Sequence, residues 1–227
     1  KISPFEEVIL VVGNEKLRLK VEQMLKTAHV NLDKDSMIIY KTNRSWMRDS
    51  GPIIVKKGKE RRALNFNFNG WAKYTNYRLD RQVPGMVAEF LNLEIEQVKY
   101  KGKPFVLEGG AIDVNGKGTL ITSEECLLDP KVQVRNPGLS REDYETVFRE
   151  FLGVTNVIWL GDGITGDDTH GHIDDLARFV NENTIVTVVE EDPKDTNYQA
   201  LQDNLKRLQQ AVLENGANPN ILTLTIH

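Results

Sequence analysis

The stretch GDGITGDDTHGHIDD, residues 161–175, decides how the rest of the chain is interpreted. Its last nine positions hold two of the four histidines of the chain together with four carboxylates. Burying such groups costs free energy unless each finds a partner, so they are not gathered for stability. The apolar runs NVIWL (156–160) and LARFV (176–180) flank the stretch and predict strands. We therefore expect a metal site or an acid/base catalytic centre at the mouth of a core.

The composition limits the classes of protein and partner. The 227 residues are 40% apolar, enough for the core of one large domain or two small ones. A net charge of −4 gives no reason to expect nucleic acid and is compatible with a cationic substrate. No apolar run approaches the length of a membrane span, and the start does not resemble a signal peptide, so we expect a cytoplasmic protein without a membrane partner. The single cysteine, Cys126, excludes an internal disulfide and fits a reducing compartment.

A unit of about sixty residues recurs along the chain. Helices are predicted at 15–27, at 83–93, at 141–152 between a capping box at Ser140 and a Gly153 C-cap, and at 197–214. A strand, a polar cluster and a hairpin follow each of the first three. The clusters place Asp49, Glu108 and Asp174 about seven residues before a turn. Units packed around an axis would bring these carboxylates together. The alternative is an ordinary mixed α/β domain with a chance match.

Five motifs stand in order along the chain: TNRSWMRDSGPIIV (42–55), FNFNGWAKY (66–74), LEGGAIDVNGKGTLITSEECLL (107–128), RNPGLSRE (135–142) and GHIDDLARFV (171–180). Together they closely resemble the agmatine deiminase and bacterial-type peptidyl-arginine deiminase family of the pentein superfamily. The pentein fold is an α/β propeller of five ββαβ units around a pseudo-fivefold axis that carries the active site. The resemblance therefore implies a single pentein domain over residues 1–227 with about three and a half units. Because both ends look like strands, we expect it to be truncated at both ends.

The resemblance also implies a reaction, hydrolysis of a guanidinium C–N bond that releases ammonia and leaves a ureido product. A cysteine thiolate attacks the guanidinium carbon, and water hydrolyses the covalent intermediate without a metal or other cofactor. The substrate would be a small cationic guanidine. We expect agmatine, which gives N-carbamoylputrescine in putrescine and polyamine biosynthesis, with peptidyl-arginine as the alternative. The sequence leaves a homo-oligomer open.

The motifs assign roles by resemblance. Asp49 and Asp174 would grip the guanidinium, since carboxylates pair with its planar fork in bidentate fashion. His172 would be the general acid/base that protonates the departing ammonia and then activates water. Glu108 is expected to be a further catalytic residue, and Asp168 a further substrate-binding residue. Both are candidates for orienting His172 or the substrate.

Other residues are expected to have smaller roles. Trp46 would wall the pocket, with core packing as the alternative. Gly109 and Gly110 would permit close backbone approach or unusual dihedral angles. Three other ionisable groups of the opening stretch would only make local hydrogen bonds: Asp167, His170 and Asp175.

No cysteine of this chain stands where the family has its nucleophile. The cysteine of the family lies near the C-terminus, in the last unit, whereas Cys126 lies in SEECLL, where we expect a hairpin strand and a small buried thiol. We therefore expect the full protein to be a deiminase and this chain alone to be inactive.

Two other functions compete with deimination. THGHIDD resembles the H-x-H-x-D-H motif of metallohydrolases through His170, His172 and Asp174, but Asp175 replaces the last histidine. We therefore predict no metal site. A non-catalytic pentein used for binding, like the ribosome-associated anti-association factor of the superfamily, would have no reason to keep a guanidinium-gripping set.

Overall fold

The computed structural model describes residues 5–30 and 36–226. Within them three sheets share one construction, in which a helix connects an antiparallel hairpin to a third strand that lies parallel to the hairpin's second strand. The first unit contains β3 (Ile53–Lys57), β4 (Glu60–Asn65), α3 (Val83–Phe90) and β5 (Glu94–Gln97). The second contains β8 (Asp113–Val114), β9 (Thr119–Ser123), α5 (Arg141–Leu152) and β10 (Asn156–Leu160). The third contains β11 (Ala177–Asn181), β12 (Thr184–Val189), α6 (Tyr198–Gln210) and β13 (Asn220–Thr225).

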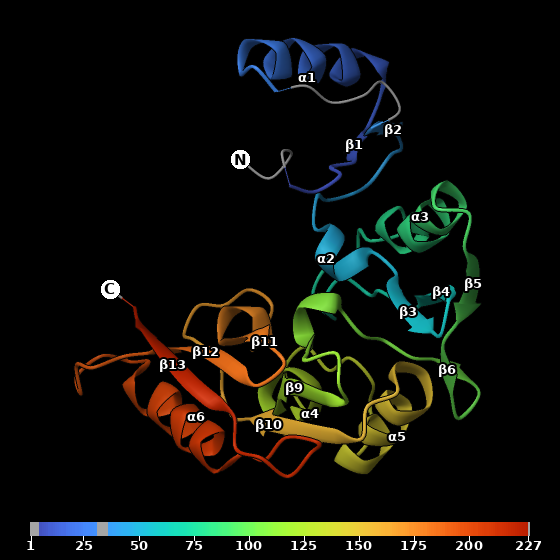
Figure 1. Ribbon diagram of the computed structural model, residues 1–227. Helices are drawn as coiled ribbons and strands as arrows, with labels where there is room; N and C mark the ends of the chain where they lie inside the picture. The colour runs from blue at the N-terminus through green and yellow to red at the C-terminus, as the bar shows by residue number, and fades with distance from the viewer. Residues whose placement is uncertain (1–4, 31–35, 227) are drawn as a thin grey trace.

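A partial unit precedes these three. β1 (Leu10–Val12) and β2 (Met37–Ile39) pair in parallel and are joined through α1 (Glu15–Thr27). Figure 1 shows the units following one another in an arc, from α1 in blue to α6 in red. The chain therefore has the ββαβ repeat of a pentein-type α/β propeller, with the predicted three and a half units. No helix in the described ranges is both long and apolar enough to cross a membrane.

The cores lie between successive units. Strand β9 separates two of them, because its side chains alternate between its faces. Leu120 belongs to a cluster that includes Tyr144 and Phe148 of α5, whereas Ile121 belongs to a cluster with Leu201 of α6. Both faces of β9 are thus buried, which fixes the ends of this strand and the loops that follow it.

The boundaries of α1 and α5 agree with the predictions. Ser140 and Asp143 form the capping box of α5, and Gly153 ends the helix with a left-handed φ of 69°. The prediction that α6 continues to residue 214 is wrong, because Ala211 is already extended (φ −67°, ψ 153°). Likewise, α3 ends at Phe90 and not at residue 93. The strand predicted at the N-terminus begins at Leu10, and residues 1–4 and 227 lie outside the described ranges.

The segment SEECLL is a helix, not the expected hairpin strand. It forms α4 (Glu124–Leu128), and the Ser123 side chain caps it by accepting a hydrogen bond from the Cys126 amide at 3.2 Å. Glu124 and Glu125 occupy its first turn, where carboxylates are favourable. Cys126 is buried, as predicted.

Candidate active site

Each complete unit is preceded by a short helical turn, and the middle turn packs against the other two. The turns are α2 (Met47–Ser50), η3 (Gly109–Ala111) and η4 (Ile173–Asp175). Arg48 of α2 ties the first turn to the second, because its Nε donates to the Gly109 carbonyl at 3.0 Å and its Nη2 to the Ile112 carbonyl at 3.2 Å. The Gly110 amide returns a hydrogen bond to Asp49 Oδ1 at 3.1 Å. Equivalent positions of the repeat are thereby brought to one place.

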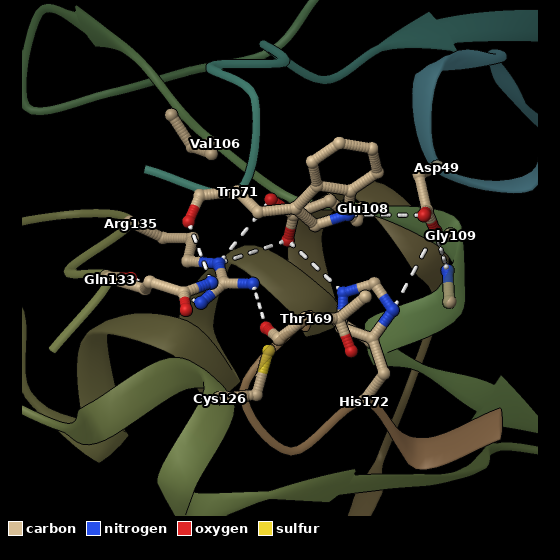
Figure 2. A network of polar contacts seen from close by, with 12 residues as sticks. Asp49, Trp71, Val106, Glu108, Gly109, Cys126, Gln133, Arg135, Thr169 and His172 are labelled. Atoms are coloured by element: carbon tan, nitrogen blue, oxygen red, sulfur yellow. Dashed lines mark hydrogen bonds and ion pairs between the residues drawn. The ribbon is translucent and has the colours of Figure 1, made fainter. Parts of the chain in front are cut away.

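His172 lies at this place and is 2% exposed. Its Nδ1 is 3.7 Å from Asp49 Oδ1 and 3.8 Å from Asp174 Oδ1, and its Nε2 is 3.8 Å from Glu108 Oε2. Figure 2 shows Asp49 and Glu108 at opposite edges of the imidazole. The structure therefore brings together the four residues predicted to be catalytic, from the turns before three successive units.

Gly110 marks the point on which three of these side chains converge. A Cβ placed on Gly110 would lie 2.5 Å from His172 Nδ1, 2.6 Å from Asp49 Oδ1 and 2.9 Å from Asp174 Oδ2. A Cβ on the neighbouring Gly109 would lie 2.2 Å from the Arg48 carbonyl oxygen. Both glycines therefore serve close backbone approach, one of the two reasons predicted for them.

Glu108 is held by an arginine that the sequence analysis did not identify. Arg135 and Glu108 have fully buried side chains, and Arg135 Nε lies 3.3 Å from Glu108 Oε1. The remaining guanidinium nitrogens donate to the carbonyls of Gln133, at 3.0 Å, and Thr169. Because the guanidinium is satisfied on several sides, it fixes the position of Glu108 beside His172 (Figure 2).

Burial and neighbouring charges shift the pKa values of the site residues in opposite directions. Burial raises the pKa of Asp49 above its ordinary value, although the charge of His172 opposes the rise. Burial would also raise the pKa of Glu108, but Arg135 and His172 outweigh it and hold that pKa below its ordinary value. For His172, burial is outweighed by Cys126 and Glu108, which raise its pKa to about 11. The site thus combines a protonated imidazole with carboxylates, a charge pattern suited to acid/base chemistry on a cation.

A second tryptophan, Trp71, contacts the site through Asp49, and the pocket-wall role of Trp46 stays a prediction. The Trp71 indole is buried and its Nε1 donates to Asp49 Oδ2 at 3.1 Å. Trp46 is 61% exposed at the start of α2, so the alternative that it packs in a core is wrong. Trp71 belongs to the motif FNFNGWAKY, which was the available signal.

The paired aspartates 167 and 168 have different surroundings. Asp168 is exposed and contacts Lys73 Nζ at 2.6 Å and the Tyr74 hydroxyl at 2.8 Å, so it does not orient the His172 ring. Asp167 accepts hydrogen bonds from the amides of Gly171, at 2.7 Å, and His172, at 3.3 Å, and thereby shapes the loop. A role for Asp168 in binding substrate stays a prediction.

The metallohydrolase ligands do not assemble. His170 turns away to Asp129, 2.9 Å from its Nε2, and to Glu125, 3.3 Å from its Nδ1. Within the described ranges, the one group of three residues able to hold a metal ion contains neither His170 nor Asp174. The local role predicted for His170 agrees with these contacts.

A buried imidazole among carboxylates on the turns of repeated ββαβ units defines the pentein class of α/β propellers. A family model described as Porphyromonas-type peptidyl-arginine deiminase matches residues 1–227. The chain belongs to this family.

Relatives in sequence and structure agree with this assignment. The chain is 37% identical to the agmatine deiminase of Pseudomonas fluorescens over all of its own length and 58% of that protein. The agmatine deiminase structure of Enterococcus faecalis matches 99% of this chain and 59% of its own, with 30% identity and a TM-score of 0.85. A substrate-bound Cys-to-Ser variant of the C. jejuni agmatine deiminase matches 99% of this chain and 62% of its own, with 32% identity and a TM-score of 0.82. The chain thus spans less than two thirds of the length of these relatives.

Proposed function

We propose that the complete protein containing this chain hydrolyses agmatine to N-carbamoylputrescine and ammonia. One observation carries the proposal: atoms of His172, Asp49 and Asp174 all lie within 2.9 Å of the position that a Cβ on Gly110 would take. A planar cation with donors in a fixed fork fits this arrangement, since two carboxylates can hold it while an imidazole reaches the same group. The names of the Pseudomonas fluorescens and Enterococcus faecalis relatives support agmatine as that cation.

The chemistry proceeds in two halves. A cysteine thiolate from outside residues 1–227 attacks the guanidinium carbon held by Asp49 and Asp174. The C–N bond breaks, and His172 gives a proton so that ammonia leaves. Water then attacks the same carbon and loses one proton to His172. The C–S bond breaks as the second proton of that water passes to solvent, which releases the neutral ureido product and restores the thiolate. Glu108, fixed by Arg135, holds His172 protonated and in place for the first half.

Cys126 is not the nucleophile in this scheme. Figure 2 shows its sulfur on the Glu108 side of the imidazole, whereas the two carboxylates that grip the substrate lie beside Nδ1. The C. jejuni relative that was solved with substrate bound carries a Cys-to-Ser substitution, which supports a cysteine nucleophile in the family.

The test is ammonia release by the complete protein from agmatine, free arginine and an arginine-containing peptide. Turnover of agmatine alone supports the proposal. Turnover of the peptide instead would move the function to the activity named in the family description, and turnover of none would overturn deimination. The cytoplasmic location and the homo-oligomer remain predictions, which fractionation and light scattering would check.

Gly110→Ala is expected to lower kcat/KM for agmatine by about 10- to 100-fold. The new methyl group occupies the point of convergence and displaces His172 or the carboxylates, and small misplacements of reacting groups have effects of this size. Gly85→Ala is the matched control, because a Cβ at this position in α3 meets nothing within 4 Å. It should leave kcat/KM unchanged and add about 0.4–1 kcal/mol to stability. Equal kinetics for the two variants would contradict the location of the site.

Trp71→Phe is expected to move the acid limb of kcat/KM for agmatine to higher pH. Asp49 must be ionised to grip a cation, and burial already raises its pKa above 3.8. The Trp71 hydrogen bond lowers that pKa, so its loss lets the pKa rise further. The acid limb of the kcat/KM profile reports the pKa values of groups in the free enzyme, which include Asp49. Trp159→Phe, at a tryptophan whose Nε1 donates to Glu145 at 2.9 Å, serves as the control. An unmoved limb in Trp71→Phe would contradict the role of Asp49.

A further inference from the structure

Cys126 is a buried thiol beside the site that the proposed reaction does not use. It is 2% exposed. Ser123 fixes Cys126 relative to the loop that carries His172, hereafter the histidine loop. The Ser123 hydroxyl accepts a hydrogen bond from the Cys126 amide and donates one to the Gly171 carbonyl next to His172. The thiol is therefore held against the site by a short and direct link.

The potential ligand atoms of Glu108, Cys126 and His172 all lie within 4.8 Å of one another, and the three residues are buried. Thiolate, imidazole and carboxylate are the ligand types that Zn²⁺ takes in proteins. Typical zinc bond lengths at tetrahedral angles put neighbouring ligand atoms about 3.4–3.6 Å apart. The 3.8 Å between His172 Nε2 and Glu108 Oε2 is too long for a hydrogen bond but close to that spacing.

His172 Nε2 supplies a second, independent observation. Among the described residues it has no hydrogen-bond partner, although it is buried and faces Glu108 and Cys126 (Figure 2). Buried polar atoms are rarely left in this condition, and such an atom calls for an explanation. A metal ion between the three side chains would provide its partner.

The surroundings also resemble the outer shell of a zinc site. Ligating histidines usually donate their other ring N–H to a carboxylate or carbonyl. Asp49 and Asp174 flank Nδ1 at 3.7 and 3.8 Å, on the correct side of the ring although beyond hydrogen-bond distance. Ligating carboxylates are themselves hydrogen-bonded, as Arg135 provides for Glu108.

We propose that Glu108, Cys126 and His172 form an inhibitory site for Zn²⁺, with a water molecule in the fourth position. The ion binds Nε2 of His172 and draws the Glu108 carboxylate away from the imidazole. The imidazole can then no longer transfer protons. Binding of the ion is independent of the proposed deimination, whereas the inhibition rests on it.

Binding is tested by titrating the protein with Co²⁺ as a spectroscopic substitute for Zn²⁺. One Co²⁺ per chain, with a thiolate-to-cobalt charge-transfer band that Zn²⁺ abolishes, is the expected result. The band should disappear in Cys126→Ser and in Cys126→Ala, each checked for folding by circular dichroism. His170→Asn, which alters a histidine held by two carboxylates without a thiol, should retain it. A missing band in the wild type, or one that survives in both Cys126 variants, overturns the proposal.

Inhibition is tested separately. Zn²⁺ should inhibit agmatine hydrolysis, and a chelator should restore the activity. Cys126→Ser should raise the inhibitory concentration of Zn²⁺ at least about tenfold, because losing a ligand weakens a metal site more than losing an outer-shell partner. Equal inhibition of both proteins would place the inhibitory ion elsewhere and overturn that part of the proposal. A cobalt band in a protein without agmatine turnover would sustain the metal site and refute the proposed function.

Discussion

Replacing His172 with glutamine is expected to lower kcat for agmatine by about 10²–10⁴-fold with little change in KM. The amide cannot give a proton to ammonia or take one from water, and general acid/base catalysis is worth this much. Asp49 and Asp174, which hold the guanidinium in the proposed reaction, remain in place. Steady-state ammonia release measures both constants.

The control for this prediction is His170→Gln, two residues away in the same loop. His170 is also partly buried and contacts carboxylates, yet it points to Asp129 and Glu125 and away from the site. Its substitution should leave kcat close to the wild-type value. A raised KM at unchanged kcat in His172→Gln would show that the imidazole binds substrate and does not transfer protons.

Arg135→Met is expected to lower the free energy of unfolding by about 3–5 kcal/mol. The substitution leaves the Glu108 carboxylate buried without its cation, and breaking a fully buried ion pair has this effect. The double variant Arg135→Met/Glu108→Gln removes the stranded charge and should recover a large part of the loss. Urea unfolding of the single and double variants measures both. Arg62→Met, at an exposed pair with Glu96, should be close to neutral.

The effect of Arg135→Met should depend on pH. The pKa of Glu108 in the folded protein lies below its ordinary value of 4.5, so its ion pair stabilises the fold above that pH. As the pH falls below 4.5 the unfolded chain takes up the proton first, and the stabilisation declines until Glu108 is protonated in the folded state as well. The difference between wild type and variant should therefore narrow in acid. A constant difference would mean that Arg135 acts through packing alone.

The fold could be predicted from the sequence because its signals are local. Each unit repeats a carboxylate, an apolar strand and a turn at fixed spacing, and the capping box at Ser140 with Gly153 defines a helix without tertiary information. SEECLL was assigned wrongly for the same reason. Its apolar residues also fit a strand, and only the capping hydrogen bond from the Cys126 amide to Ser123 shows the helix.

The site could be predicted only in part. Asp49, Glu108 and Asp174 occupy equivalent places in the repeat, which predicts that they meet. Arg135 and Trp71 lie outside that repeat position, and their contacts with Glu108 and Asp49 bridge 27 and 22 residues of chain. No local pattern specifies such long-range pairs.

Adjacent residues of one type present the same difficulty. Asp167 and Asp168 cannot be distinguished from the sequence. In the structure Asp167 shapes the histidine loop, whereas Asp168 contacts Lys73. Which of two neighbours faces the site depends on the path of the loop. That path follows from packing and not from the sequence of the loop alone.

The central claim is that this site holds a guanidinium for attack by a cysteine outside residues 1–227. Mass spectrometry of the complete protein, quenched in acid during agmatine turnover and analysed intact and after peptide mapping, tests it most directly. We predict an adduct with the mass of agmatine less that of ammonia, on a cysteine other than Cys126, that is lost in Asp49→Asn. An adduct on Cys126, or steady turnover without any adduct, would contradict the account.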